Sequence, residues 1–163
     1  MAPEESDSTV TVVGDSEVVL ADAAGTRERF EWGSREYTIN CHSGRTIEGR
    51  WSGVPMAPVA EAAEFPPETT HLLMTAADGY RVCVDAWSGL SGFVGFTCEE
   101  LTVEGGEAYA LRETPRFLAP EIDSSRTIRD LARIEAITLQ PGEDVRDYET
   151  GHGPTVPESE SRL

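Results

Sequence analysis

Short segments in which apolar and polar residues alternate recur along most of this chain, and glycine or proline separates many of them. The clearest pair is His71–Ala76 and Tyr80–Asp85, which flank Ala77-Asp78-Gly79. Alternation with a period of two predicts strands that are buried on one face. An Asp-Gly turn between two such strands predicts a hairpin, in which Gly79 supplies a positive φ. The pattern therefore predicts antiparallel pairing in this part of the chain.

The same criteria predict further strands and two short helices. Strands are expected at Val10–Val13, Ser16–Leu20, Arg35–Cys41, Phe93–Thr97, Tyr109–Arg112, Arg116–Ala119 and Arg133–Leu139. Helices are expected at Val54–Ala63, where Pro55 stands near the first turn, and over one or two turns at Ile128–Ala132. Many short strands with few helices predict an α+β fold, in which the pairing is mixed but mostly antiparallel.

The ends of the chain differ in composition from its middle. Residues 1–8 are polar and acidic, and residues 140–163 combine acids with proline and glycine and carry few apolar side chains. Such composition predicts a disordered N-terminus and a flexible acidic tail, so residues 9–139 are the expected folded domain. No apolar run approaches the roughly 18 residues that a membrane span needs, and the N-terminus lacks the pattern of a signal peptide. We therefore expect a cytoplasmic protein without a membrane partner.

The charge of this acidic protein has an unusual source. The net charge is -17, from 30 acidic and 13 basic side chains, and every basic residue is arginine. Molar salt shortens the Debye length to about 3 Å, so it screens the repulsion between many carboxylates. An excess of acids without lysine thus predicts a halophilic protein, and a halophilic archaeon is the expected source. The absence of a basic cluster disfavours nucleic-acid binding.

Four short motifs follow one another in a fixed order. They are Cys41 followed by Trp51-Ser52-Gly53-Val54-Pro55, then Ala77-Asp78-Gly79-Tyr80, then Pro115-Arg116-Phe117-Leu118-Ala119-Pro120, and finally the segment Arg126–Glu135. Together, over about residues 10–139, they resemble the molybdopterin-binding domain of the sulfite oxidase family. The resemblance implies the fold of that domain in a short, stand-alone form.

The resemblance also implies a site and an activity. The thiolate of Cys41 would be a ligand of molybdenum, and the guanidinium groups of Arg116, Arg126 and Arg129 would bind the molybdopterin. Arg45 lies in the segment that would border the metal, so it would either attract a small anionic substrate or pair with surface acids. The implied activity is a two-electron oxygen-atom transfer on a small oxyanion or oxide. A separate electron-transfer protein would then accept the electrons.

Departures from the family pattern leave a second interpretation open. Arg112-Glu113-Thr114 stands where the family usually has His-Gly, and Asp130 stands where it often has tryptophan. A cofactor-free member of the same fold, acting as a binding or interaction module, would tolerate both changes. A cysteine at a strand end is also common as a small buried apolar residue, which gives Cys41 an ordinary alternative role. The three cysteines form no Cys-x-x-Cys pair, so neither zinc nor a disulfide framework is expected.

Overall fold

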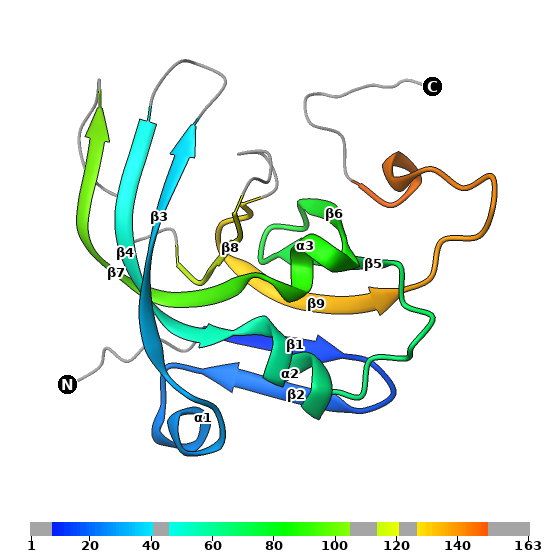
Figure 1. Cartoon of the computed structure of the whole chain (residues 1–163), viewed down its shortest axis with the longest axis horizontal. Coiled ribbons are helices and arrows are strands. Elements are labelled where there is room, and N and C mark those ends of the chain that lie inside the picture. Colours follow the sequence, from blue (N-terminus) through cyan, green and yellow to red (C-terminus); the bar gives the residue numbers. More distant parts are fainter. Residues whose placement is uncertain (1–7, 41–45, 105–113, 121–126, 150–163) are drawn as a thin grey trace.

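Two β-sheets form the frame of the domain. The computed structural model describes residues 8–40, 46–104, 114–120 and 127–149 (Figure 1). In spatial order, sheet A contains β2 (Glu17–Ala21), β1 (Thr9–Val13), β9 (Leu131–Ile137), β5 (His71–Ala76) and β6 (Arg81–Asp85). Sheet B contains β3 (Gly33–Asn40), β4 (Thr46–Pro55), β7 (Phe93–Glu104) and β8 (Arg116–Leu118). Three short helices complete the described part, namely α1 (Ala24–Arg29), α2 (Met56–Ala62) and α3 (Ala86–Leu90).

The pairing in both sheets is almost entirely antiparallel. The exception is β1, which runs parallel to β9 in the middle of sheet A, with Val12 opposite Ile134. This arrangement confirms the predicted α+β class with mixed, mostly antiparallel strands. It also places the first and last strands of the domain side by side.

The main hydrophobic core lies between sheet A, sheet B and the helix α2. Alternate residues of β1 and β5, such as Val10, Val12, Leu72 and Met74, are fully buried in this core. The alternation is the one that the sequence pattern predicts for strands with one face turned to the interior.

Around β8 and the facing part of β7, sheet B is buried on both faces. Val94 and Phe117 belong to the main core, whereas their chain neighbours Phe93 and Leu118 belong to a second cluster with Trp51. Because successive side chains of a strand point to opposite faces, the second cluster lies on the other side of the sheet.

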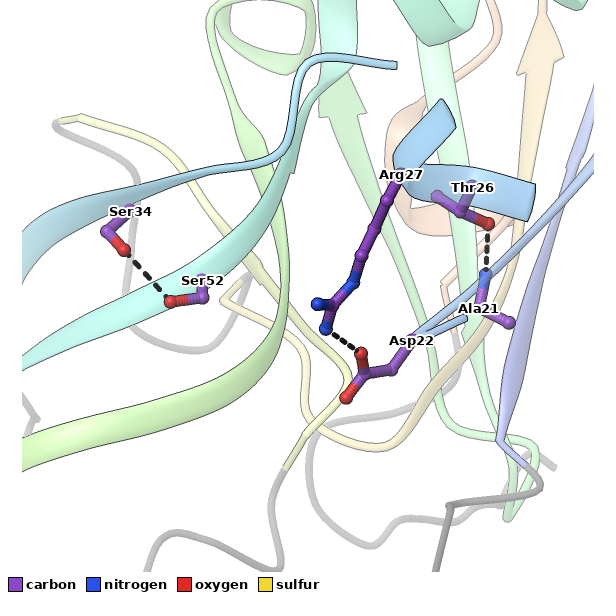
Figure 2. A network of polar contacts seen from close by, with 6 residues as sticks. All are labelled: Ala21, Asp22, Thr26, Arg27, Ser34 and Ser52. Carbon is purple, nitrogen blue, oxygen red and sulfur yellow. Dashed lines mark hydrogen bonds and ion pairs between the residues drawn. The ribbon is translucent and has the colours of Figure 1, made fainter. Parts of the chain in front are cut away.

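The helix α1 connects the two sheets and is held by polar contacts. The Oγ1 atom of Thr26 accepts a hydrogen bond from the backbone N–H of Ala21 at 3.0 Å, and Arg27 pairs with Asp22 (Figure 2). The hydroxyl groups of Ser34 and Ser52 lie 2.9 Å apart across β3 and β4. These contacts fix the direction in which the chain leaves sheet A and enters sheet B.

Two of the sequence predictions are wrong. Residues Ile128–Ala132 form no helix, because Asp130 has a φ of 52° and β9 already begins at Leu131. The other helix begins at Met56 rather than Val54, because Val54 and Pro55 still pair with β7. The strand expected at Tyr109–Arg112 lies outside the described residues.

The chain after β9 turns back towards sheet A. Residues 138–149, here called the C-terminal segment, contain the 3₁₀ turn η3 (Val145–Asp147), which Asp144 caps. The hydroxyl of Thr70 accepts a hydrogen bond from the backbone N–H of Leu139 at 2.8 Å. The carboxylate of Glu149 accepts one from the backbone N–H of Cys83 in β6, also at 2.8 Å. In the parts of the chain that the structure describes, no helix has the length and apolar character of a transmembrane span.

Candidate cofactor site

Only part of the predicted site falls within the described residues. Cys41, Arg45 and Arg126 lie outside them, whereas Arg116 and Arg129 are described. The described part of the site therefore consists of Arg116, Arg129 and the motifs around them.

The third and fourth sequence motifs meet through their backbones. The N–H of Phe117 donates to the carbonyl of Ile128 at 3.1 Å, and the N–H of Leu131 donates to the carbonyl of Pro115 at 2.9 Å. These two hydrogen bonds bring Arg116 and the segment around Arg129 together.

The second motif joins the same region. The N–H of Ala77 donates to the carbonyl of Asp130 at 2.8 Å. Gly79 has a φ of 96°, as the Asp-Gly turn predicts, and the carboxylate of Asp78 accepts a hydrogen bond from the N–H of Tyr80 at 3.0 Å. Three of the four motifs are thus neighbours in the fold.

Arg116 begins β8 and is buried. Arg116 and Thr127 are each 5% exposed. The Nη2 atom of Arg116 donates a hydrogen bond to the Oγ1 atom of Thr127 at 3.4 Å. Sequence reasoning missed Thr127, although it directly follows the predicted phosphate ligand Arg126. Arg129 is exposed. A guanidinium beside a hydroxyl is a donor set of the kind that suits a phosphate group, although here both residues are buried.

The Trp51–Pro55 part of the first motif packs against β7. A Cβ atom on Gly53 would lie 1.9 Å from the carbonyl oxygen of Val94, and one on Gly95 would lie 2.8 Å from the Cβ of Trp51. Trp51 itself is fully buried. Its indole and the two glycines therefore set the close spacing of β4 and β7.

The residue that precedes Cys41 lies far along sheet B from Arg116. Asn40 pairs with Thr46 at one end of the β3–β4 hairpin, whereas Arg116 pairs with Gly95, which in turn pairs with Gly53. The length of β4 from Thr46 to Gly53 is roughly 20 Å at the usual rise of a strand. In Figure 1 the end of β3 accordingly points away from β8.

No second metal site is evident in the described part of the chain. Among those residues, no group of three or more His, Cys, Asp or Glu side chains is placed to hold a metal ion. Cys83 and Cys98 are both buried, at 2% and 4% exposure, as expected of small core residues. Arg50, on β4, donates to the carboxylate of Glu36 at 2.7 Å across the hairpin. This contact matches the ordinary role of a surface arginine.

The two sheets with their short covering helices define a mixed α+β fold, and that fold is found in a redox enzyme. Among solved structures, the chain is similar to the sulfane dehydrogenase SoxCD from Paracoccus pantotrophus, with a TM-score of 0.63 and 14% sequence identity. The match covers 83% of this chain but only 39% of that chain, so this protein spans well under half of its structural neighbour. At this identity the likeness shows the fold alone. No protein-family profile and no curated protein sequence matches the chain.

Proposed function

We propose that this chain is a molybdopterin-dependent oxidoreductase of the sulfite oxidase type, acting on a small oxyanion or oxide. The observation that carries this proposal is the set of three backbone hydrogen bonds that join the second, third and fourth motifs. They gather a buried arginine with a hydroxyl partner, Arg116 and Thr127, and an exposed arginine, Arg129, within one region. The shared fold with a dehydrogenase supports a redox function.

Each predicted site residue has a role in this proposal. Arg116, Arg126 and Arg129 hold the phosphorylated cofactor, Cys41 supplies a thiolate to the metal, and Arg45 attracts the anionic substrate. The bound cofactor supplies two-electron oxygen-transfer chemistry, which the protein alone lacks. A separate electron-transfer protein in the cytoplasm would be the electron acceptor.

Metal content tests this proposal directly. We expect about one molybdenum per chain in protein purified from a salt-adapted host that makes the cofactor, measured by mass spectrometry of the metal. Cys41→Ser and Arg129→Gln are expected to lower the molybdenum content. Arg146→Gln is the matched control, because Arg146 is an exposed arginine of η3, outside the four motifs. Folded wild-type protein without molybdenum, or equal loading of all variants, would refute the proposal.

A second candidate is a cofactor-free binding module with the same fold. One observation favours this candidate. The pairing partners of Asn40 and Arg116 lie roughly 20 Å apart along β4, and a single cofactor would have to span the distance between the metal ligand and the phosphate site. The carboxylate of Asp130, next to Arg129 in the chain, also disfavours a phosphate nearby. Two results together would support this candidate. The wild-type protein would be folded but free of molybdenum, and the Cys41→Ser variant would have the same melting temperature as the wild type.

A further inference from the structure

The helix α3 presents the most exposed large apolar side chain of the described residues. Trp87 is 85% exposed, and Leu90, one helical turn further on, is 38% exposed. Isolated exposed apolar residues are common, but an indole that is almost wholly in water on a helix, with a leucine beside it, is unusual. We call these two residues the α3 apolar patch.

The α3 apolar patch stands on a rigid support. The carboxylate of Asp85 accepts a hydrogen bond from the N–H of Ser88 at 3.0 Å, and the N–H of Ala86 donates to the carbonyl of Thr70 at 2.9 Å. Gly89 lies so close to Leu72 that a Cβ atom there would meet Leu72 Cδ1 at 2.5 Å. Because the helix is held at its first turn and packed from beneath, Trp87 loses little backbone freedom when a partner binds.

The charged residues of the elements around the patch are mostly acidic. The helices α2 and α3 contain no basic residue, and α2 contacts α3 and carries the exposed Glu61. From Trp51 to Cys98, across the elements that surround α3, the only arginine is Arg81. The acids in the same span are Glu61, Glu64, Glu68, Asp78 and Asp85. Asp85 lies at the start of α3, and the hydrogen bond from Ser88 holds the pKa of its carboxyl below the ordinary value, so it stays ionised.

We propose that the α3 apolar patch is the docking surface for a partner protein that offers an apolar pocket edged by arginine or lysine side chains. Tryptophan is the side chain most often found at the energetic centre of protein interfaces. Basic groups around the pocket would complement the acids and would lie against the face of the indole. A second copy of this chain fits poorly, because a two-fold contact would bring the two acidic surfaces together.

Photo-cross-linking followed by affinity measurement tests this proposal. A photoreactive phenylalanine analogue replaces Trp87 in the intact chain, the protein is irradiated in an extract of its own host, and the cross-linked protein is identified and purified. The dissociation constants of its complexes with the unlabelled variants are then measured by calorimetry. We expect Trp87→Ala to weaken binding about tenfold or more and Leu90→Ala to weaken it less. We also expect affinity to fall as salt rises.

Val19→Ala is the matched control, because Val19 is 56% exposed on β2, away from α3, and should bind as the wild type does. The proposal is overturned if no protein is captured or if the chain cross-links only to itself. It is also overturned if the captured surface lacks basic residues, or if Trp87→Ala and Val19→Ala bind equally well. Molybdenum content is expected to be unchanged in Trp87→Ala, so this outcome is independent of the proposed redox function.

Discussion

The role of Asp85 as the cap of α3 depends on its charge. It caps α3 by accepting the N–H of Ser88, and this backbone hydrogen bond is the main reason why the pKa of its carboxyl lies below the ordinary value of 3.8. Its cross-strand neighbour His71 lowers that pKa further. Because the folded-state pKa is lower than the unfolded one, the ionised cap stabilises the fold above the unfolded pKa. This contribution is lost as the pH falls through the folded pKa.

Replacing Asp85 should therefore have an effect that depends on pH. Asp85→Ala is expected to lower the free energy of unfolding by about 1 kcal/mol at neutral pH, a typical cost of losing a helix cap. Asp85→Asn keeps an acceptor for Ser88, so it should cost less. Urea unfolding of the three proteins between pH 2 and pH 7 measures this. A difference between wild type and Asp85→Ala that stays the same at pH 2 would contradict the assigned role of the charge.

Local information was sufficient for some residues and not for others. The positive φ of Gly79 follows from the Asp-Gly turn alone, so the sequence predicted it correctly. The burial of Arg116 against Thr127 depends on the pairing of β8 with β7 and on contacts across eleven residues of chain, which no local pattern contains. The roles of Cys41 and Arg45 came from a resemblance and stay predictions.

At the level of elements, the hairpins of sheet A were predictable and the middle of sheet B was not. The strand β4 contains Gly49 and Gly53, and its pairing with β7 shifts register between Glu48 and Arg50 and again between Ser52 and Gly53. Each irregularity interrupts the period of two that identifies a strand in sequence. The helices α1 and α3 are too short for a helical period to show, and tertiary contacts determine their formation.

The contact between β4 and β7 gives a sharp test of the fold. Gly53→Ala places a methyl group against the carbonyl of Val94, so the strands must separate, and we expect a loss of 1–3 kcal/mol or more, about the cost of overpacking a core. Gly33→Ala is the control, because a Cβ atom on Gly33 would meet nothing within 4 Å. Chemical denaturation measures both variants. Equal stability of the two would show that β4 and β7 are not as close as described.

The C-terminal segment is expected to protect one face of sheet A. Leu73 and Cys83 are 8% and 2% exposed, yet neither belongs to the main core, and Glu149 bonds to the backbone of Cys83. Deleting the residues after Leu139 from a Cys41→Ser protein should therefore make Cys83 react faster with a thiol reagent. Cys98, in the second cluster, should stay slow and serves as the internal control. An unchanged rate for Cys83 after the deletion would show that other groups cover it.

At the scale of the whole molecule, the high net charge is expected to make stability depend on salt. A net charge of -17 on 163 residues produces strong self-repulsion at low ionic strength. We propose that the protein is adapted to molar salt and expect its melting temperature to be higher in 3 M potassium chloride than in 0.1 M. Differential scanning calorimetry at several salt concentrations measures this, with sucrose solutions as the uncharged control. A melting temperature that does not depend on salt would argue against such adaptation.

The parallel pairing of β1 with β9 also has a consequence for biosynthesis. The hairpin of β1 and β2 leaves the ribosome more than a hundred residues before its partner strand in sheet A, β9, is synthesised. Contacts this distant in sequence fold slowly, because a long loop must close before they form. The nascent chain must therefore keep the apolar face of this hairpin from aggregating until β9 has emerged, and we expect the acidic side chains nearby in the sequence to help keep it in solution.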